Sequence, residues 1–243
     1  MSNATLNNRT RDALMQIFQT QGLVAADEKV RELLKQCESW KDRQHERGII
    51  KGELSEIALE YHLLWWMQHV PNLTCVKSLC IKSANSKATA EIDILLASPY
   101  KIYLFECKSF KGDKVLTKEC FLKGASSSKD VYEQSRYHLR LLDENIGYCR
   151  PPLPTHVKTA PYQLVLFELS SNSLEDRRET KWQKAIPALS LSTLDAWLLN
   201  EFSRTTISQW DYPKLVAALK KLNSTSEKMF DFHMKKIYKR GKQ

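Results

Sequence analysis

The sequence predicts an α/β fold, in which helices flank a mixed central sheet in the order α-β-β-β-α-β and further helices extend both ends. Three observations support it. Three apolar segments follow one another closely between residues 73 and 108. Another lies at residues 162–168, after a helical segment, and amphipathic segments occur near both ends. A chain of 243 residues, 42% of them hydrophobic, can bury the core that such a fold needs.

The first expected elements are two helices. Apolar residues recur at helical spacing between Val30 and Cys37, which predicts an N-terminal helix. The charged stretch 41–47 and Gly48 indicate a boundary after it. A second helix is expected from about residue 51 to residue 68, because Pro71 disfavours helix in the residue before it.

Three strands should follow, at residues 73–81, 90–97 and 101–108, because these segments are rich in branched and aromatic residues. Their short connections favour antiparallel pairing. The polar stretch 111–129 is expected to form a loop, and a helix should cover about residues 130–145.

The last part of the chain is expected to return to the sheet and then to end in helices. Residues 162–168 read as a buried strand, and residues 185–191 as a further one. Helices are expected at residues 192–201, 212–222 and 227–238. The chain thus divides into a helical extension (1–48), a core (49–203) and a basic helical extension (204–243).

Composition excludes several classes of protein. The seven glycines lie too far apart for a phosphate-binding loop, and the six cysteines form no Cys-x-x-Cys pair. The longest apolar run, Leu63 to Met67, is too short to span a bilayer, and the first residues resemble no secretory signal. We therefore expect a soluble, cytoplasmic protein with no membrane partner.

Two acidic residues stand inside apolar strands. Asp93 lies within the strand at 90–97, and Glu106 lies near the end of the strand at 101–108. A buried carboxylate costs several kcal/mol unless it is paired or binds a metal. Across a hairpin both acids can reach one sheet face, and the two-residue period of a strand places Lys108 there as well.

This trio has two chemical interpretations. The two carboxylates and the carbonyl of Cys107 form a hard oxygen site suited to Mg²⁺, which activates water for attack on a phosphodiester. Lys108 would orient or help to deprotonate that water, or stabilise the transition state. The alternative is a buried structural ion pair. Two further Asp/Glu-x-Lys tripeptides occur, but both lie in polar surroundings, at Asp27 and Glu179.

The spacing of these motifs resembles the PD-(D/E)xK nuclease superfamily. The matching features are Lys51-Gly52-x-x-x-Glu56, Glu91-Ile92-Asp93, and Glu106-Cys107-Lys108 thirteen residues after Asp93. Residues from about 52 to 201 are most similar to its nuclease-related domain (NERD) group, through Gly52-Glu53, Phe105 to Gly112 and the segment from Ala185 to Leu194. The resemblance implies a restriction-endonuclease-like core and a Mg²⁺- or Mn²⁺-dependent phosphodiesterase.

The resemblance also implies roles for single residues. Asp93 and Glu106 would be metal ligands, and Lys108 the catalytic lysine. A glutamate of the first core helix would add another acid; Glu56 fits one spacing in the superfamily and Glu53 fits another, and we favour Glu56. Gln134 resembles the later glutamine of these nucleases, which orients the site.

Basic residues are candidates for binding a nucleic acid. The net charge of +9 supports a polyanionic partner, although five of these charges lie in the last ten residues. Phosphate contacts are expected from four lysines after Glu106, which are Lys111, Lys114, Lys118 and Lys123. We expect a nuclease with little intrinsic sequence specificity that acts on DNA in preference to RNA, with a homodimer or a targeting partner left open. The alternative is a catalytically silent module that binds nucleic acid or a protein.

Overall fold

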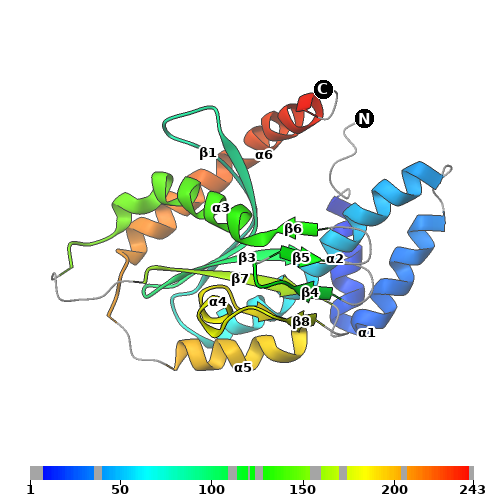
Figure 1. Ribbon diagram of the computed structural model, residues 1–243, viewed down its shortest axis with the longest axis horizontal. Coiled ribbons are helices and arrows are strands. Elements are labelled where there is room, and N and C mark those ends of the chain that lie inside the picture. The colour runs from blue at the N-terminus through cyan, green and yellow to red at the C-terminus, as the bar shows by residue number, and fades with distance from the viewer. Residues whose placement is uncertain are drawn as a thin grey trace.

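The computed structural model describes residues 8–35, 40–108, 114–119, 121–123, 128–153, 160–169, 174–203 and 207–240. They form a mixed α/β structure in which a five-stranded sheet lies between two layers of helices (Figure 1). This arrangement confirms the predicted fold class and is that of a restriction-endonuclease-like core. None of the described helices is long and apolar enough to cross a membrane.

The central sheet has the strand order β1-β2-β3-β7-β9. Strands β1 (Thr74–Lys82), β2 (Thr89–Ala97) and β3 (Ile102–Lys108) are antiparallel neighbours, as their short connections predict. Strand β7 (Tyr162–Glu168) pairs with β3, and β9 (Ala188–Leu189) pairs with β7, both in parallel, so the sheet is mixed.

Helices cover both faces of this sheet. On one face, α2 (Trp40–His69) and α5 (Leu191–Phe202) pack against β2, β3, β7 and β9. On the other, α3 (Val131–Ile146) and α6 (Tyr212–Arg240) pack mainly against β1 and β2 (Figure 1). Helix α1 (Asn8–Lys35) lies on α2, and a left-handed Gly22, with φ of 83°, kinks it.

Helix α3 begins close to the predicted position, and its capping explains why. The side chain of Asp130 accepts a 2.9 Å hydrogen bond from the backbone N–H of Glu133. This satisfies one of the N–H groups that have no partner in the first turn. A short 3₁₀ turn, η1 (Gly147–Cys149), follows the helix.

A second, smaller sheet has three of its strands in the stretch expected to be a loop, so that prediction is wrong. It has the order β6-β5-β4-β8, with β4 (Lys114–Leu116), β5 (Phe121–Lys123), β6 (Ser128–Asp130) and β8 (Leu174–Asp176). Three-residue strands are too short for their alternation to be read from sequence.

The helix bounds also differ from the prediction. Helix α2 begins at Trp40, so the boundary expected at Gly48 falls inside it. The two helices expected after residue 212 are the single helix α6, in which the hydroxyls of Ser224 and Thr225 donate hydrogen bonds to carbonyls three residues earlier. The strand expected at 185–191 shortens to β9, after helix α4 (Thr180–Ala185).

Candidate active site

The candidate site lies where β2 and β3 separate. Their pairing ends at Ile94 and Phe105, whereas β3 continues beside β7 as far as Lys108. Glu106 is therefore the first residue of β3 beyond its pairing with β2. Asp93 holds the corresponding position on β2, so the structure brings the two acids together as the hairpin predicts.

Asp93 is partly buried and bonds to the neighbouring strand. Its Oδ2 accepts a 2.7 Å hydrogen bond from the backbone N–H of Cys107. Burial, followed by the nearby negative charge of Glu106, raises the pKa of Asp93 well above its usual range. Lys108 and the Cys107 N–H act in the opposite direction but do not outweigh these causes.

Glu106 is buried and has polar partners at both carboxylate oxygens. Its Oε1 contacts the ammonium of Lys108 and accepts a 2.6 Å hydrogen bond from Nε2 of Gln134. Its Oε2 lies 3.3 Å from Nδ1 of His138. Burial alone would raise the pKa of Glu106, but the hydrogen bond with His138 and the charge of Lys108 lower it below its ordinary value.

Lys108 contacts both Glu106 and helix α3. Its Nζ donates a second hydrogen bond, of 3.3 Å, to Oε1 of Gln134. Burial lowers the pKa of Lys108, but the charges of Glu106 and Asp93 outweigh burial and raise it. The amine therefore stays protonated at neutral pH, which favours an electrostatic role for Lys108 over that of a general base.

Helix α3 supplies the residues that hold this carboxylate. Gln134 and His138 are one turn apart, so both side chains face β3. Gln134 hydrogen-bonds to both Glu106 and Lys108. No role was predicted for His138, although its spacing of four residues from Gln134 was a usable signal.

The acid of the first core helix approaches from the other face of the sheet. The buried thiol of Cys107 packs with apolar residues of α2. Burial, followed by the charges of Asp93 and Glu56, raises the pKa of this thiol. The negative charge of Glu56 on α2 is therefore close enough to Cys107 to disfavour the thiolate form of this residue. The side chain of Glu53, the alternative, lies outside the described residues.

The donor set can be tested against the expected Mg²⁺. Among the residues that the structure describes, no three His, Cys, Asp or Glu side chains are arranged to hold a metal ion. The set instead combines two carboxylates, Asp93 and Glu106, with the backbone carbonyl of Cys107. These oxygens suit a hard cation, and the raised pKa of Asp93 marks a place where added positive charge is favourable.

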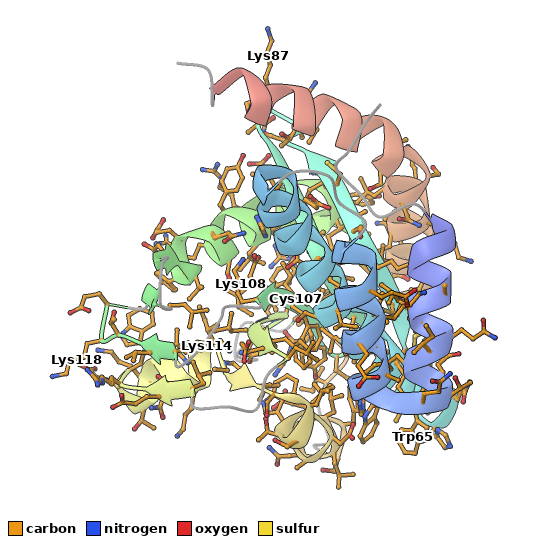
Figure 2. All side chains as sticks on the ribbon, turned by 90° about the vertical axis from the view of Figure 1, so that its right-hand side faces the viewer. Trp65, Lys87, Cys107, Lys108, Lys114 and Lys118 are labelled. Atoms are coloured by element: carbon orange, nitrogen blue, oxygen red, sulfur yellow. The ribbon has the colours of Figure 1, made fainter. Side chains whose placement is uncertain are left out.

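The four lysines expected to contact phosphate do not share one environment. Lys114 must be withdrawn from that set, because its side chain is fully buried and its Nζ lies 2.7 Å from Oε1 of Glu168. Lys118 is exposed in the turn that follows β4, at the periphery of the molecule (Figure 2). Lys111 and the side chain of Lys123 lie outside the described residues. Figure 2 also shows Lys108 and Cys107 close together near the centre of the molecule.

The comparisons with known proteins agree with this location. Residues 51–169 match the family model of the nuclease-related domain, a segment that contains Asp93, Glu106, Lys108 and Gln134. No curated protein matches the chain. One solved structure that matches is titled a protein of unknown function, AF1548, with 10% identity and a TM-score of 0.31. The match covers 60% of this chain and 66% of that one, and a likeness this weak says nothing about function.

Proposed function

We propose that the protein is a metal-dependent nuclease that hydrolyses phosphodiester bonds of DNA, because residues 51–169 match the family model of the nuclease-related domain. The observation that carries the proposal is the convergence of Asp93, Glu106 and Lys108 where β2 and β3 separate. Two carboxylates can bind a metal ion that activates water, and one ammonium can stabilise negative charge on a phosphate group, as cleavage of a polyanionic substrate requires.

The residues of the site have distinct roles in this proposal. Asp93, Glu106 and the carbonyl of Cys107 would hold Mg²⁺ or Mn²⁺, with Glu56 as a further acid from α2. When bound there, the cation would lower the pKa of a water molecule and neutralise charge on the scissile phosphate. Gln134 keeps Glu106 and Lys108 in place through its two hydrogen bonds.

Lys108 acts as a cation in this mechanism. Its raised pKa keeps the ammonium charged at neutral pH, next to the carboxylates that would face the phosphate. A fixed positive charge lowers the energy of the transition state, in which negative charge accumulates on the phosphate oxygens. For this purpose the Lys108 ammonium must turn from Glu106 toward the substrate.

The substrate would be held by its backbone. Lys118 is exposed in the turn that follows β4, and Lys111 and Lys123 remain candidates from the sequence. Contacts of this kind provide affinity without reading the bases. Sequence specificity would then be low, and the target would be chosen by DNA structure or ends, by a second copy of the chain or by a partner protein.

One observation favours a second candidate, a catalytically silent module that binds nucleic acid or a protein. Lys108 contacts Glu106 directly, and the described side chains include no preformed cluster of three metal ligands. In this reading, Glu106 and Lys108 form a buried structural ion pair, and an added cation does not displace the ammonium.

A cleavage assay on several substrates separates the two candidates. The purified chain is incubated with supercoiled plasmid, linear duplex, single-stranded DNA and RNA, each with Mg²⁺, with Mn²⁺ and with EDTA. A nuclease cuts at least one substrate only with the metal, and Lys108→Ala loses that cut while still binding. Binding without cleavage under every metal condition would favour the silent module. Cleavage of RNA alone would show that the substrate is RNA and not DNA.

A further inference from the structure

Strand β1 contains an irregularity at Ser78. This residue has a φ of 46°, in the left-handed region that side chains other than glycine rarely adopt. Val76 and Leu79 lie on either side of it and pack into the same core cluster. In a regular strand, residues three apart point to opposite faces, so the backbone at Ser78 reverses the alternation of β1.

In strand β2, the side chains also switch faces, at the position opposite Ser78. Ile92 and Leu95 are also three residues apart and belong to that same cluster. The ladder between the strands is interrupted before it resumes at Leu79 and Ile92. The skipped positions on the two strands are Ser78 and Asp93. The kink in β1 therefore lies directly across from the candidate catalytic acid.

A serine of the C-terminal helix holds the kink. Ser226 of α6 accepts a 2.7 Å hydrogen bond from the backbone N–H of Cys80. Its hydroxyl donates a 3.1 Å hydrogen bond to the backbone carbonyl of Ser78. Ser226 is 6% exposed, and its hydroxyl both accepts and donates, so the buried group is satisfied. Its two bonds tie α6 to β1 on both sides of Leu79.

We infer that Ser226 is a positioning residue for Asp93. The shared reversal of β1 and β2 lies at Asp93, whose Oδ2 reaches across the separating strands to the N–H of Cys107. A hydroxyl that holds the kink in β1 thereby holds the strand that carries Asp93. Calling Asp93 catalytic rests on the proposed function, whereas the hydrogen bonds themselves do not.

This inference extends the functional unit beyond the family match. The nuclease-related domain match ends at residue 169, and Ser226 lies well beyond it, 148 residues along the chain from Ser78. Helix α6 packs along β1, so the C-terminal extension forms part of the structure that supports the site (Figure 1).

Amide hydrogen exchange of the full-length, metal-free chain tests the inference. Ser226→Ala should speed exchange at Cys80 and Cys107 by about 3- to 10-fold, the factor that corresponds to one net hydrogen bond. Exchange at Leu104 and Leu166, in the sheet core, should not change. The matched control is Ser224→Ala, because Ser224 is exposed and donates its hydrogen bond to the carbonyl of Lys221, within α6 itself.

Three outcomes would decide the matter. Faster exchange at Cys80 and Cys107, with Leu104 unchanged, supports positioning of Asp93 by α6. Faster exchange at Cys80 alone overturns it, since the kink would then relax without reaching Asp93. Equal acceleration at every core amide also overturns it, because Ser226 would only stabilise the sheet. Exchange is read without metal or substrate, so a chain that cuts nothing would refute the nuclease proposal and leave this result intact.

Discussion

Oδ2 of Asp93 accepts a 2.7 Å hydrogen bond from the backbone N–H of Cys107, which follows the second acid, Glu106, on the neighbouring strand. The two acids are thus held close together, yet their surroundings shift their pKa values in opposite directions. The pKa of Asp93 is raised by burial and by the charge of Glu106, whereas His138 and Lys108 lower the pKa of Glu106. Opposite effects on stability follow.

Asp93→Asn should stabilise the metal-free protein at neutral pH. The folded state holds the Asp93 proton more tightly than the unfolded state does, so the free energy of unfolding falls as pH rises toward the raised pKa. Asparagine carries no charge to bury, and its side-chain oxygen can still accept the hydrogen bond from the N–H of Cys107. The free energy of unfolding should therefore rise by on the order of 1 kcal/mol. Urea unfolding in EDTA, in mildly acidic and mildly basic buffer, measures the change. A variant less stable than the wild type at basic pH contradicts the prediction.

Glu106→Gln should have the opposite effect and destabilise the protein by about 1–3 kcal/mol, because it removes the buried charge that faces Lys108 and His138. A lowered pKa contributes stability above the pKa of the unfolded chain, and this stability is lost as pH falls through the folded pKa. The destabilisation should therefore shrink in acid, which urea unfolding can follow. Glu133→Gln, at an exposed position of α3, is the control and should leave stability unchanged. Equal losses in the two variants would exclude a special environment at Glu106.

Lys114 and Lys118 should respond differently to the same substitution. Lys114→Met removes the buried ammonium that faces Glu168 and should cost about 3–5 kcal/mol of stability. Lys118→Met, at an exposed position, should change stability by less than about 0.5 kcal/mol. It should weaken DNA binding and reduce the slope of log affinity against log salt by about 1. Thermal unfolding and a salt series of binding curves measure both effects, and an unchanged slope would remove Lys118 from the interface.

The cleavage rate should rise with pH over a range above that of an ordinary aspartate. Asp93 must be ionised to hold a cation, and its raised pKa delays ionisation beyond the usual value of about 3.9. The lowered pKa of Glu106 means that this acid is already charged there. Rates at Mg²⁺ concentrations below saturation and at constant ionic strength, from mildly acidic to neutral buffer, give the profile, because Asp93 must then lose its proton before the cation binds. A rate that does not vary over this range would show that Asp93 does not limit the reaction.

The central acids could be predicted because their sequence context is unusual. Asp93 and Glu106 interrupt apolar strands, and a hairpin with a short connection can pair them in only a few ways. Their pattern resembled that of a known family, and the match over residues 51–169 agrees with it. The order of the main strands followed from the same local signals.

The other parts of the site depend on contacts between distant residues. Lys114 looked like a surface lysine because nothing near it in sequence reveals its partner, Glu168. Ser226 falls in a gap between two expected helices. Its hydrogen bonds to β1 connect it to Cys80 and Ser78, which lie 146 and 148 positions earlier in the sequence. Short strands such as β4 also carry too few residues for a pattern.

The most direct test measures plasmid cleavage and DNA binding side by side for the wild type and Asp93→Asn. The asparagine keeps the shape of the site and its bond to Cys107 but loses the charge that a cation requires. We predict that the wild type cuts with Mg²⁺ and not with EDTA. Asp93→Asn should bind DNA as tightly and cut it about 100-fold more slowly or not at all. Cleavage by Asp93→Asn at the wild-type rate would contradict the assignment of the active site.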